Sequence, residues 1–322
     1  MKKILTANLA AVLLLLAAGC EKVIEFNGEV LEPRLTLSSC AQVGDTLTAC
    51  VASSVFFLAD KKSGAAFTDG LDTLRGSVRC FVNGEKTPRP MWLDRGADAA
   101  SLCYRADYTP APGDHIRLEA DFPGFDPAWA ETRVPREPAI EVLSARLVKA
   151  NLGNWDAFFE EMEDIFDLEI TLAVTDDASY EKYYCLGAAA LMLDEWNEDL
   201  FRVHYGFSSN DILFRQMDRS DALSLLAGDG GRYFSDALIK GQRHSFTITV
   251  SSISQWELDT MVSFGLQTAT VNENLYWYDY SYQQSMFSVG GLFAEGVTLY
   301  SNVNGGYGYF GAAAPVWLEV EW

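Results

Sequence analysis

Three sets of residues in this sequence have types and spacings that could support chemistry. They are the acids, the histidines and one glycine-rich run. The three histidines, His115, His204 and His244, stand outside the H-E-x-x-H spacing of a zinc site, and no G-x-S-x-G turn marks a nucleophilic serine. We interpret them as strand-surface residues. Acids gather at 156–167 and 194–199, where they would line a solvated helix face and a loop instead of converging on a hard cation. These patterns predict no catalytic residues, no metal site and no cofactor.

The glycine-rich run from Gly306 to Gly311 matches the G-x-G-x-x-G pattern of dinucleotide-binding sites. Such a site also needs a strand before the pattern, a helix after it and an acid about 20 residues further on. Only 11 residues follow Gly311, and Pro315 interrupts them, so no such helix fits. We expect a glycine-rich loop in which aromatic rings pack against bare backbone.

Tyr276, Tyr278, Tyr280 and Tyr282 occupy alternate positions, which predicts a strand with four phenol rings on one face. A tyrosine presents a flat apolar ring with a polar tip, which suits a sugar ring or a partner protein. These four residues are therefore the candidate binding residues. The alternative is that the rings pack under a neighbouring loop or helix as part of a core.

The N-terminus has the pattern of an export signal. Lys2 and Lys3 precede ten apolar residues from Leu9 to Ala18, and Cys20 follows shortly after. Ten helical residues span about 15 Å, half of a bilayer, so this segment is no transmembrane helix. The sequence before Cys20 resembles a bacterial lipobox, where a signal peptide (here residues 1–19) is removed and acyl chains such as palmitate are attached to the cysteine. Two or three acyl chains hold a protein stably on a membrane.

The chain is 322 residues long and strongly acidic, with 45 Asp and Glu against 24 Lys and Arg and a formal net charge of −21. Such a surface repels phosphate groups, so nucleic acid and anionic membrane surfaces are excluded as partners. Aromatic residues make up 13% of the chain, and their preference for strands predicts a globular, mostly β protein.

Five cysteines lie beyond Cys20, so at least one of them stays unpaired. Cys40 and Cys50 flank a turn signal at Gly44-Asp45 and would pair across a hairpin. Disulfides are permitted in an exported protein, but small buried thiols fit the same positions. The sequence leaves open the pairing among Cys40, Cys50, Cys80, Cys103 and Cys185.

Residues 31–137 read as short strands separated by turns, which predicts an immunoglobulin-like β-sandwich after an anchor and linker at 20–30. Asn83-Gly84 is a strong hairpin signal. Four prolines between 121 and 138 predict a loop that leads to a domain boundary near 137, because proline cannot join the interior of a sheet.

Residues 138–322 predict a β-rich domain with two or three helical insertions. Apolar residues at helical spacing predict a helix over 154–167, and alternation predicts a strand over 168–174. The other predicted elements are a helix at 254–267 that opens with the capping box Ser254 and Glu257, a helix at 220–227, and strands at 276–282, 297–303 and 316–320.

Three segments, together with the lipobox and the β-rich first half, resemble the family of Bacteroidota lipoproteins that carry "domain of unknown function 4249". They are Asp-Asp-Ala-Ser-Tyr-Glu-Lys-Tyr-Tyr at 176–184, Tyr-Phe-Ser-Asp-Ala-Leu-Ile-Lys-Gly at 233–241 and Ser-Asn-Val-Asn-Gly-Gly-Tyr-Gly-Tyr-Phe-Gly-Ala at 301–312. The likeness covers nearly the whole chain after Cys20. Gly306 stands where the family usually has Leu.

The resemblance implies a lipid-anchored outer-membrane accessory protein, often encoded beside a TonB-dependent transporter, and it brings no activity or catalytic residues. We therefore expect a non-enzymatic binding protein that assists such a transporter in nutrient uptake, with a glycan or a peptide as ligand. A fimbrial-type structural adhesin is the alternative, followed by a metal-assisted hydrolase. The side of the outer membrane that the protein faces stays open.

Replacing Cys20 tests the anchor. In Cys20→Ala we expect the protein to move from the outer-membrane fraction to the soluble periplasmic fraction, because the acyl chains are the only predicted anchor. Cell fractionation with immunoblotting measures this, and Cys185→Ala, which keeps the lipobox, is the control. If the Cys20 variant still pellets with outer membranes and resists salt washing, the assignment is wrong.

Overall fold

The computed structural model describes residues 32–54, 68, 70–94, 101–150, 164–179, 182–194, 199–215, 231–288 and 298–322. Residues 33–54 and 65–322 form one compact unit, and 1–32 with 55–64 form another, of which only Glu32 is described. The predicted signal peptide and linker, Cys20, and the predicted helices over 154–163 and 220–227 lie outside the described residues.

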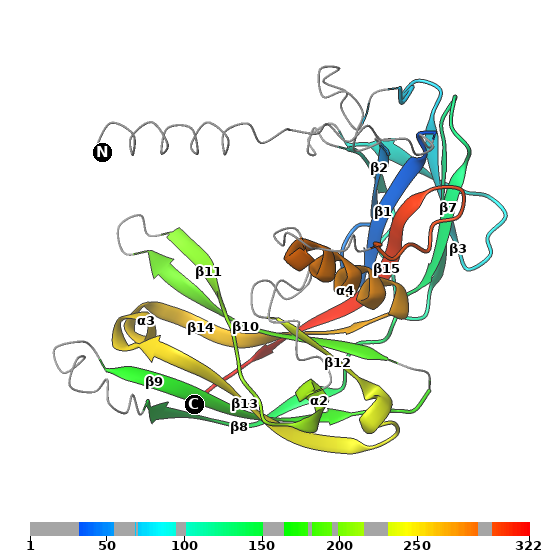
Figure 1. Ribbon diagram of the computed structural model, residues 1–322. Coiled ribbons are helices and arrows are strands. Elements are labelled where there is room, and N and C mark those ends of the chain that lie inside the picture. The colour runs from blue at the N-terminus through cyan, green and yellow to red at the C-terminus, as the bar shows by residue number, and fades with distance from the viewer. Residues whose placement is uncertain are drawn as a thin grey trace, which may run out of the picture. The chain divides into compact units, whose positions relative to one another are not determined.

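Most strands belong to one twelve-stranded sheet (Figure 1). In pairing order its members are β11 (Asp199–Tyr205), β10 (Tyr183–Asp194), β14 (Met261–Val271), β15 (Tyr307–Glu319), β1 (Leu35–Gln42), β2 (Thr48–Ser53), β5 (Leu102–Ala106), β4 (Arg89–Leu93), β3 (Ser77–Val82), β6 (His115–Asp121) and β7 (Ala128–Arg133), with β12 (Arg232–Ser235) paired to β10. A second sheet holds β13 (Arg243–Ser254), β9 (Ile165–Thr175) and β8 (Ile140–Lys149). The fold is mostly β, as predicted.

The helical elements of the described residues are few. They are α2 (Ile212–Arg215), the 3-10 helix η3 (Asp236–Leu238), α3 (Gln255–Thr260) and α4 (Glu273–Ser288). Within the described ranges no helix is long and apolar enough to cross a membrane.

The strands of the first half bury alternate residues, as the pleat of a strand requires. On β1 and β6 the side chains of Leu35, Leu37, Ile116 and Leu118 are all fully buried, while their neighbours are partly exposed. Side chains from β1 to β7 and from the start of β15 share this core. The immunoglobulin-like arrangement and the boundary near 137 stay predictions.

A second core joins the two sheets. Leu168, Ile170 and Leu172 alternate along β9 and pack in one cluster with Leu186 of β10 and Leu266 of β14. β10 is buried on both faces from its first residue to Ala190. At its start, Tyr183 and Cys185 pack with Leu275 and Tyr276 of α4 on the face that this core leaves free. Small residues in the middle of β10 let both layers approach it closely.

β15 is the strand that serves both halves. Its first part pairs in parallel with β1, from Tyr307 to Ala313, and its second part pairs antiparallel with β14, from Ala313 to Glu319. Phe310 therefore lies in the core of the first half, while Leu318 packs on the core of the second. The predicted strand at 316–320 is the end of this longer strand.

The prediction of a strand over Tyr276–Tyr282 is wrong, because these residues belong to α4. The buried positions of α4 are Leu275, Tyr276, Asp279 and Gln283, which have the spacing of one helix face. Two of these four are polar, so the apolar period of a helix is hidden in the sequence. The tyrosines at alternate positions have the period of a strand, which led to the wrong prediction.

Four other elements differ from their predictions. The strand β7 lies inside the proline-rich stretch predicted to be a loop, since the prolines flank it without interrupting it. The capping box of Ser254 and Glu257 is present, but α3 ends at Thr260 and β14 follows directly. Ile165 and Phe166, placed in a helix, begin β9, and the described residues 298–303, expected as a strand, have no regular structure.

A disulfide joins Cys50 of β2 to Cys103 of β5, at directly paired positions. The pairing of Cys40 with Cys50, one of those that the sequence left open, does not form, because β5 and not β1 places a cysteine opposite Cys50. Among the described cysteines, Cys40, Cys80 and Cys185 form no disulfide. Burial raises the pKa of Cys80 to about 12, so this thiol stays protonated and is no nucleophile.

The glycines before and within β15 allow two backbones to touch. Gly308 has φ +108°, and a Cβ there would lie 2.2 Å from the carbonyl oxygen of Leu37; a Cβ on Gly306 would lie 2.3 Å from that of Leu35. The prediction of a loop packed with aromatic rings is wrong here, because residues 307–311 belong to β15 and the backbone of β1, not an aromatic ring, approaches Gly306 and Gly308.

Valine at these positions should therefore destabilise the protein. For Gly308→Val and Gly306→Val we expect a loss of at least about 1 kcal/mol of unfolding free energy and a melting temperature lower by several degrees. Gly206→Val is the control, because a Cβ on Gly206 meets nothing within 4 Å. Thermal melts followed by circular dichroism measure the difference. Equal melting of all three variants would contradict the close contact of β1 and β15.

Candidate functional site

The four candidate tyrosines do not form one row. On a helix, residues four apart share a face, and the rings pair accordingly: Tyr276 with Tyr280 and Tyr278 with Tyr282, each at 6.3 Å between ring centroids. The structure therefore brings these residues together as two separate stacks on α4. The strand face predicted for them does not exist.

Tyr276 belongs to the core. Its ring stacks on Tyr183 at 4.0 Å and meets Tyr233 edge-on at 5.7 Å. The Tyr233 hydroxyl donates to the carboxylate of Asp279, which is fully buried on the same face of α4. Burial raises the pKa of Tyr276, so its hydroxyl stays neutral. For this residue the alternative of packing, and not recognition, is correct.

Tyr278 faces β15. Its ring stacks on Tyr309 at a centroid distance of 3.7 Å, and burial raises the pKa of both hydroxyls. Tyr282, half-buried, extends the stack along the helix. These rings attach α4 to the strand that runs through both halves.

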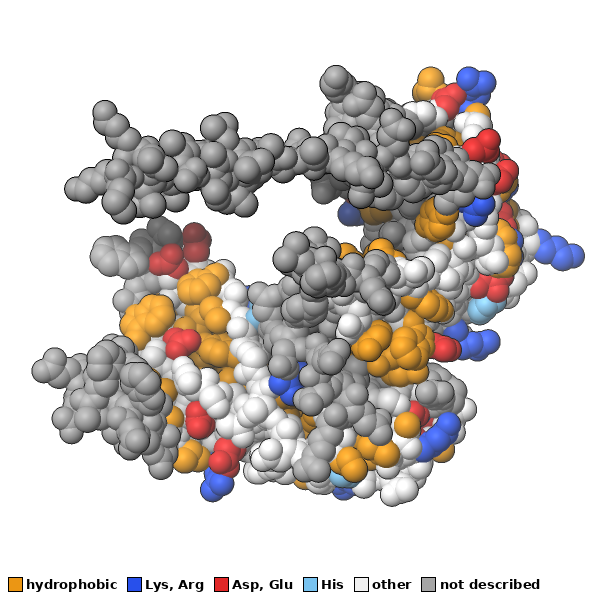
Figure 2. All heavy atoms as spheres, viewed as in Figure 1, with side chains coloured by type: hydrophobic (Ala, Val, Ile, Leu, Met, Phe, Trp, Pro, Cys, Tyr) orange, Lys and Arg blue, Asp and Glu red, His pale blue; other side chains and the backbone are white. Residues whose placement is uncertain are grey.

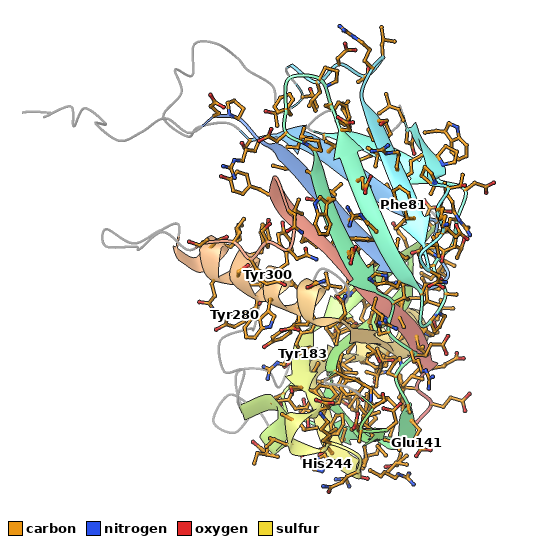
Figure 3. The ribbon with its side chains drawn as sticks, turned by 90° about the vertical axis from the view of Figure 1, so that its right-hand side faces the viewer. Phe81, Glu141, Tyr183, His244, Tyr280 and Tyr300 are labelled. Carbon is orange, nitrogen blue, oxygen red and sulfur yellow. A yellow bond between two sulfur atoms is a disulfide. The ribbon has the colours of Figure 1, made fainter. Side chains whose placement is uncertain are left out.

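The exposed aromatic surface of α4 is made by Trp277 and Tyr280. Their rings are 37% and 39% exposed and meet edge-on at 5.9 Å, and both rest on the buried ring of Tyr276. In Figure 3, Tyr280 and Tyr183 lie on the same side of α4, and Tyr300 lies on the other side. Of the four candidates, Tyr280 alone offers an exposed platform.

A cleft of about 470 Å³ lies where the first turn of α4 meets β6 and β7. Most of the residues that line it are of polar type: His115 from β6, Glu131, Thr132 and Arg133 from β7, Asn272, Glu273 and Asn274 from the start of α4, and Pro135. Its volume lies within the range of small-molecule sites. Sequence reasoning assigned none of these residues a function, apart from testing His115 as a histidine.

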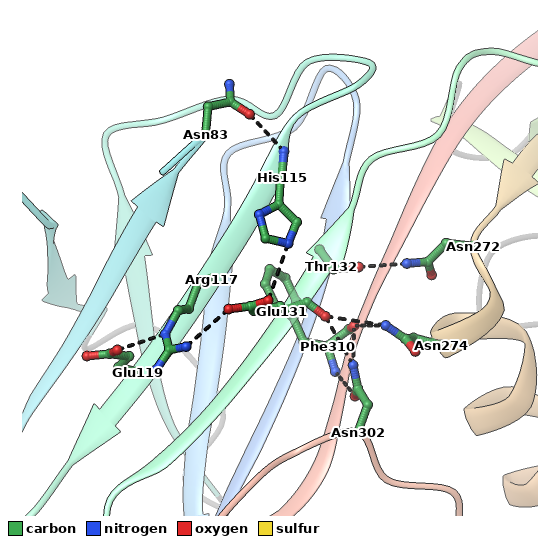
Figure 4. Close-up of polar contacts among 10 residues, drawn as sticks. All are labelled: Asn83, His115, Arg117, Glu119, Glu131, Thr132, Asn272, Asn274, Asn302 and Phe310. Atoms are coloured by element: carbon green, nitrogen blue, oxygen red, sulfur yellow. Dashed lines mark hydrogen bonds and ion pairs between the residues drawn. The ribbon is translucent and has the colours of Figure 1, made fainter. Parts of the chain in front are cut away.

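Three asparagines hold the walls of this cleft in place (Figure 4). The amide of Asn302 both accepts from the Phe310 N–H, at 2.9 Å, and donates to the Phe310 carbonyl, at 3.1 Å, as a neighbouring strand would. The same amide reaches the Glu131 carbonyl at 3.3 Å, and Asn274 also donates to both carbonyls. Asparagine side chains therefore bridge β7 and β15.

Asn272 completes this bridge and begins α4. Its side chain oxygen accepts from the Leu275 N–H, as an N-cap residue does, and from the Ala312 N–H of β15. Its amide nitrogen donates to the Thr132 hydroxyl at 2.7 Å. We call Asn272, Asn274 and Asn302 the asparagine bridge. The sequence signal for it was faint: Asn302 lies in the third family-like segment.

Ion pairs order the charged wall of the cleft. Glu131 lies 3.4 Å from the His115 ring and 3.1 Å from the Arg117 guanidinium, which also donates to Glu119. Burial opposes the charge of Arg117, but its hydrogen bonds to Glu131 and Glu119 outweigh burial and raise its pKa. The Arg117 guanidinium also lies 4.0 Å from the ring centre of Trp129.

The cleft offers hydrogen-bonding groups. The hydroxyl of Thr132 accepts a hydrogen bond from Asn272. In the part of the chain that the structure describes, no three His, Cys, Asp or Glu side chains gather as metal ligands. His204 on β11 and His244 on β13 belong to other strands than His115, and His244 pairs with Asp211 at 3.0 Å.

The first two family-like segments meet in a buried ionic cluster. Lys182, 5% exposed, pairs with Asp176 at 2.8 Å and with Asp177, and Asp176 also accepts from the Gly241 N–H at 2.6 Å. Burial opposes ionisation of Asp176, but these hydrogen bonds outweigh it and lower its pKa. The cluster ties the start of β10 to the turn after η3, so its role is structural.

Hydrophobic side chains gather over β11 and α3 in Figure 2. The most exposed are Leu200 and Phe201 on β11, Trp256 on α3 and Val262 on β14, each between 43% and 57% exposed. The exposed acids Asp199 and Asp259 belong to the same elements. We call Leu200, Phe201, Trp256 and Val262 the apolar end of the sheet; Leu200 and Phe201, consecutive on β11, point to its opposite faces. Exposed apolar side chains gathered at one end of a sheet are typical of a contact surface for another protein.

Comparison with protein families matches residues 21–316 to the family described as "Domain of unknown function (DUF4249)". All three family-like segments lie inside the matched range, and the structure gives each of them a bonding role. No curated protein matches the chain.

Alanine substitution of one buried and one exposed tyrosine tests which rings of α4 belong to the core. Tyr276→Ala should lower the free energy of unfolding by about 3–5 kcal/mol, as other large-to-small core changes do. Tyr280→Ala should cost about 1 kcal/mol or less, because its ring is partly in water. Urea unfolding of the two variants measures both. Equal losses would contradict the division of α4 into a buried and an exposed aromatic face.

Proposed function

The chain belongs to the DUF4249 family, and we propose that it is a lipid-anchored, non-enzymatic binding protein of the outer membrane that assists a TonB-dependent transporter. Acyl chains on Cys20 would hold it on the membrane. The disulfide between Cys50 and Cys103 supports export, because such bonds persist in oxidising compartments.

The cleft beside α4 is the observation that carries a binding function. It is a formed hollow whose walls come from two paired strands and one capped helix, so its polar groups stay in place without a ligand. Preorganised groups lose little conformational entropy when a ligand binds, which lets a few hydrogen bonds suffice.

The bonds that the family-like segments make favour a binding function over a catalytic one. Asp176, Lys182 and Gly241 tie two turns together, and Asn302 with its glycines seats β15. Residues whose side chains are held in such bonds position the surfaces of the protein and do not take part in a reaction. Among the described residues, the surfaces that we consider for a partner are the cleft, the exposed edge of α4 and the apolar end of the sheet.

The apolar end of the sheet is our candidate for the transporter contact. Its apolar centre carries acidic residues on the same elements, so it fits a protein surface with an apolar centre and basic surroundings. The same acids disfavour contact with anionic lipid head groups.

Co-purification tests this function. Tagged full-length protein is isolated from native outer membranes in mild detergent, and the associated proteins are quantified by mass spectrometry. We expect a TonB-dependent transporter to be enriched, and to be lost in the double variant Leu200→Ser and Phe201→Ser. The control Leu143→Ser changes another exposed leucine, on β8. A ladder of self-polymers in place of a channel would favour the fimbrial adhesin and contradict the proposal.

A further inference from the structure

The cleft beside α4 continues past its charged wall. A second hollow, of about 200 Å³, lies over β3 and β6 and shares His115 and Glu131 with the first. Phe81, Arg117 and Glu119 line this smaller hollow. The two hollows are therefore one groove, divided by the pair of His115 and Glu131, and we call it the β6–β7 groove.

The charges around the smaller hollow are already paired with one another. Glu131 is held by Arg117 and His115, and Glu119 by Arg117 and by Arg79, at 3.1 Å. Glu85 pairs with Arg89 at 2.9 Å. A charged ligand beside these groups would have to break such pairs or leave its own charge unmatched.

Anions in particular are disfavoured. The larger hollow has one guanidinium, Arg133, and two carboxylates, Glu131 and Glu273. The net charge of −21 on the whole chain acts in the same direction. The groove therefore suits a ligand that is polar but uncharged.

Hydroxyl groups match the hydrogen-bonding chemistry of the walls. The side chains of Glu131, His115 and Arg117 are planar, half-exposed, and supply both acceptors and donors. A hydroxyl both donates and accepts, so neighbouring hydroxyls on a ring can bond to such side chains without charge. The half-buried ring of Phe81 gives the smaller hollow an apolar face for the C–H side of such a ring.

The groove is also rigid, as weak polar binding requires. Phe81, Arg117 and Glu131 lie on three neighbouring strands at directly paired positions, so their spacing is set by the backbone ladders. The asparagine bridge fixes the Glu131 carbonyl against β15, and the ring of Trp129 supports Arg117.

We infer that the β6–β7 groove is a binding site for a neutral saccharide chain, with one ring against Phe81 and the next hydrogen-bonded by Glu131 and His115. The inference rests on the proposed binding function and gives it a ligand class. It places recognition in the groove and not on the exposed edge of α4.

The test is a titration of the full-length protein in detergent, by calorimetry, with hexasaccharides of glucose, mannose, galactose and xylose and with an oligogalacturonate as the acidic counterpart. We expect at least one neutral hexasaccharide to bind and the acidic one to fail. Glu131→Gln and His115→Ala should each weaken binding roughly tenfold or more, as expected when a hydrogen bond to a charged or ring group is lost. Phe81→Ala should do the same.

Glu141→Gln is the matched control, because it makes the same change on β8, far from Phe81 in Figure 3. It should bind as the wild type does. Circular dichroism melts of every variant confirm that the fold is kept. The neutral O-polysaccharide of the cell's own lipopolysaccharide forms a further arm: binding of that chain alone assigns the saccharide to the cell surface, and binding of the hexasaccharides assigns it to a nutrient.

The inference is overturned if no neutral saccharide binds, if the acidic one binds better, or if Tyr280→Ala abolishes binding while the groove variants keep it. These outcomes leave the transporter contact untouched, because co-purification depends on the apolar end of the sheet. Loss of co-purification with intact saccharide binding would in turn contradict only the proposed partnership.

Discussion

The pairing of β15 with two different neighbours is the constraint on which this molecule depends. One strand of 13 residues lies beside β1 for its first part and beside β14 for its second, so the two cores share a single continuous backbone. Each part leaves one edge of the strand without a ladder partner. Unpaired backbone groups cost free energy when buried, and the first part solves this with side chains: the asparagine bridge supplies the donors and acceptors that another strand would give.

That solution creates the site. Because amide side chains and not a strand fill the space between β7 and β15, the two strands stand apart at this point, and the first turn of α4 enters beside them. The cleft is formed by this junction. Its polar character follows from the same cause, since the groups that bridge the strands also form part of the wall. The same hydrogen bonds therefore hold the fold together and shape the cleft. The ion pairs of β6 and β7 order the open side of the cleft.

The family-like segments have a common physical meaning. The glycines near the C-terminus permit backbone contact, Asn302 replaces a strand, and Asp176 and Lys182 tie two turns together in a buried pair. A motif of this kind is a signature of a fold. Its residues mark the parts of the structure that hydrogen bonds and close backbone packing hold rigid. The residues of the proposed saccharide site, such as Glu131 and His115, lie outside the motifs.

The sequence by itself determined the β-rich character, the alternating strands of the first half and the capping box of α3, because these depend on neighbours in the chain. It also identified the glycines of β15, because the absence of a side chain is a property of the residue itself and can be read from the sequence. Only the tertiary structure decided that Tyr276 to Tyr282 form a helix: the polar Asp279 and Gln283 lie on its buried face, where Tyr233 bonds Asp279, and no local pattern reveals a partner 46 residues away. The disulfide and the cleft were hidden for the same reason. Cys103 meets Cys50 because β5 pairs with β2, and Asn272 meets Thr132 because α4 begins beside β7; both contacts are set by topology and not by sequence spacing.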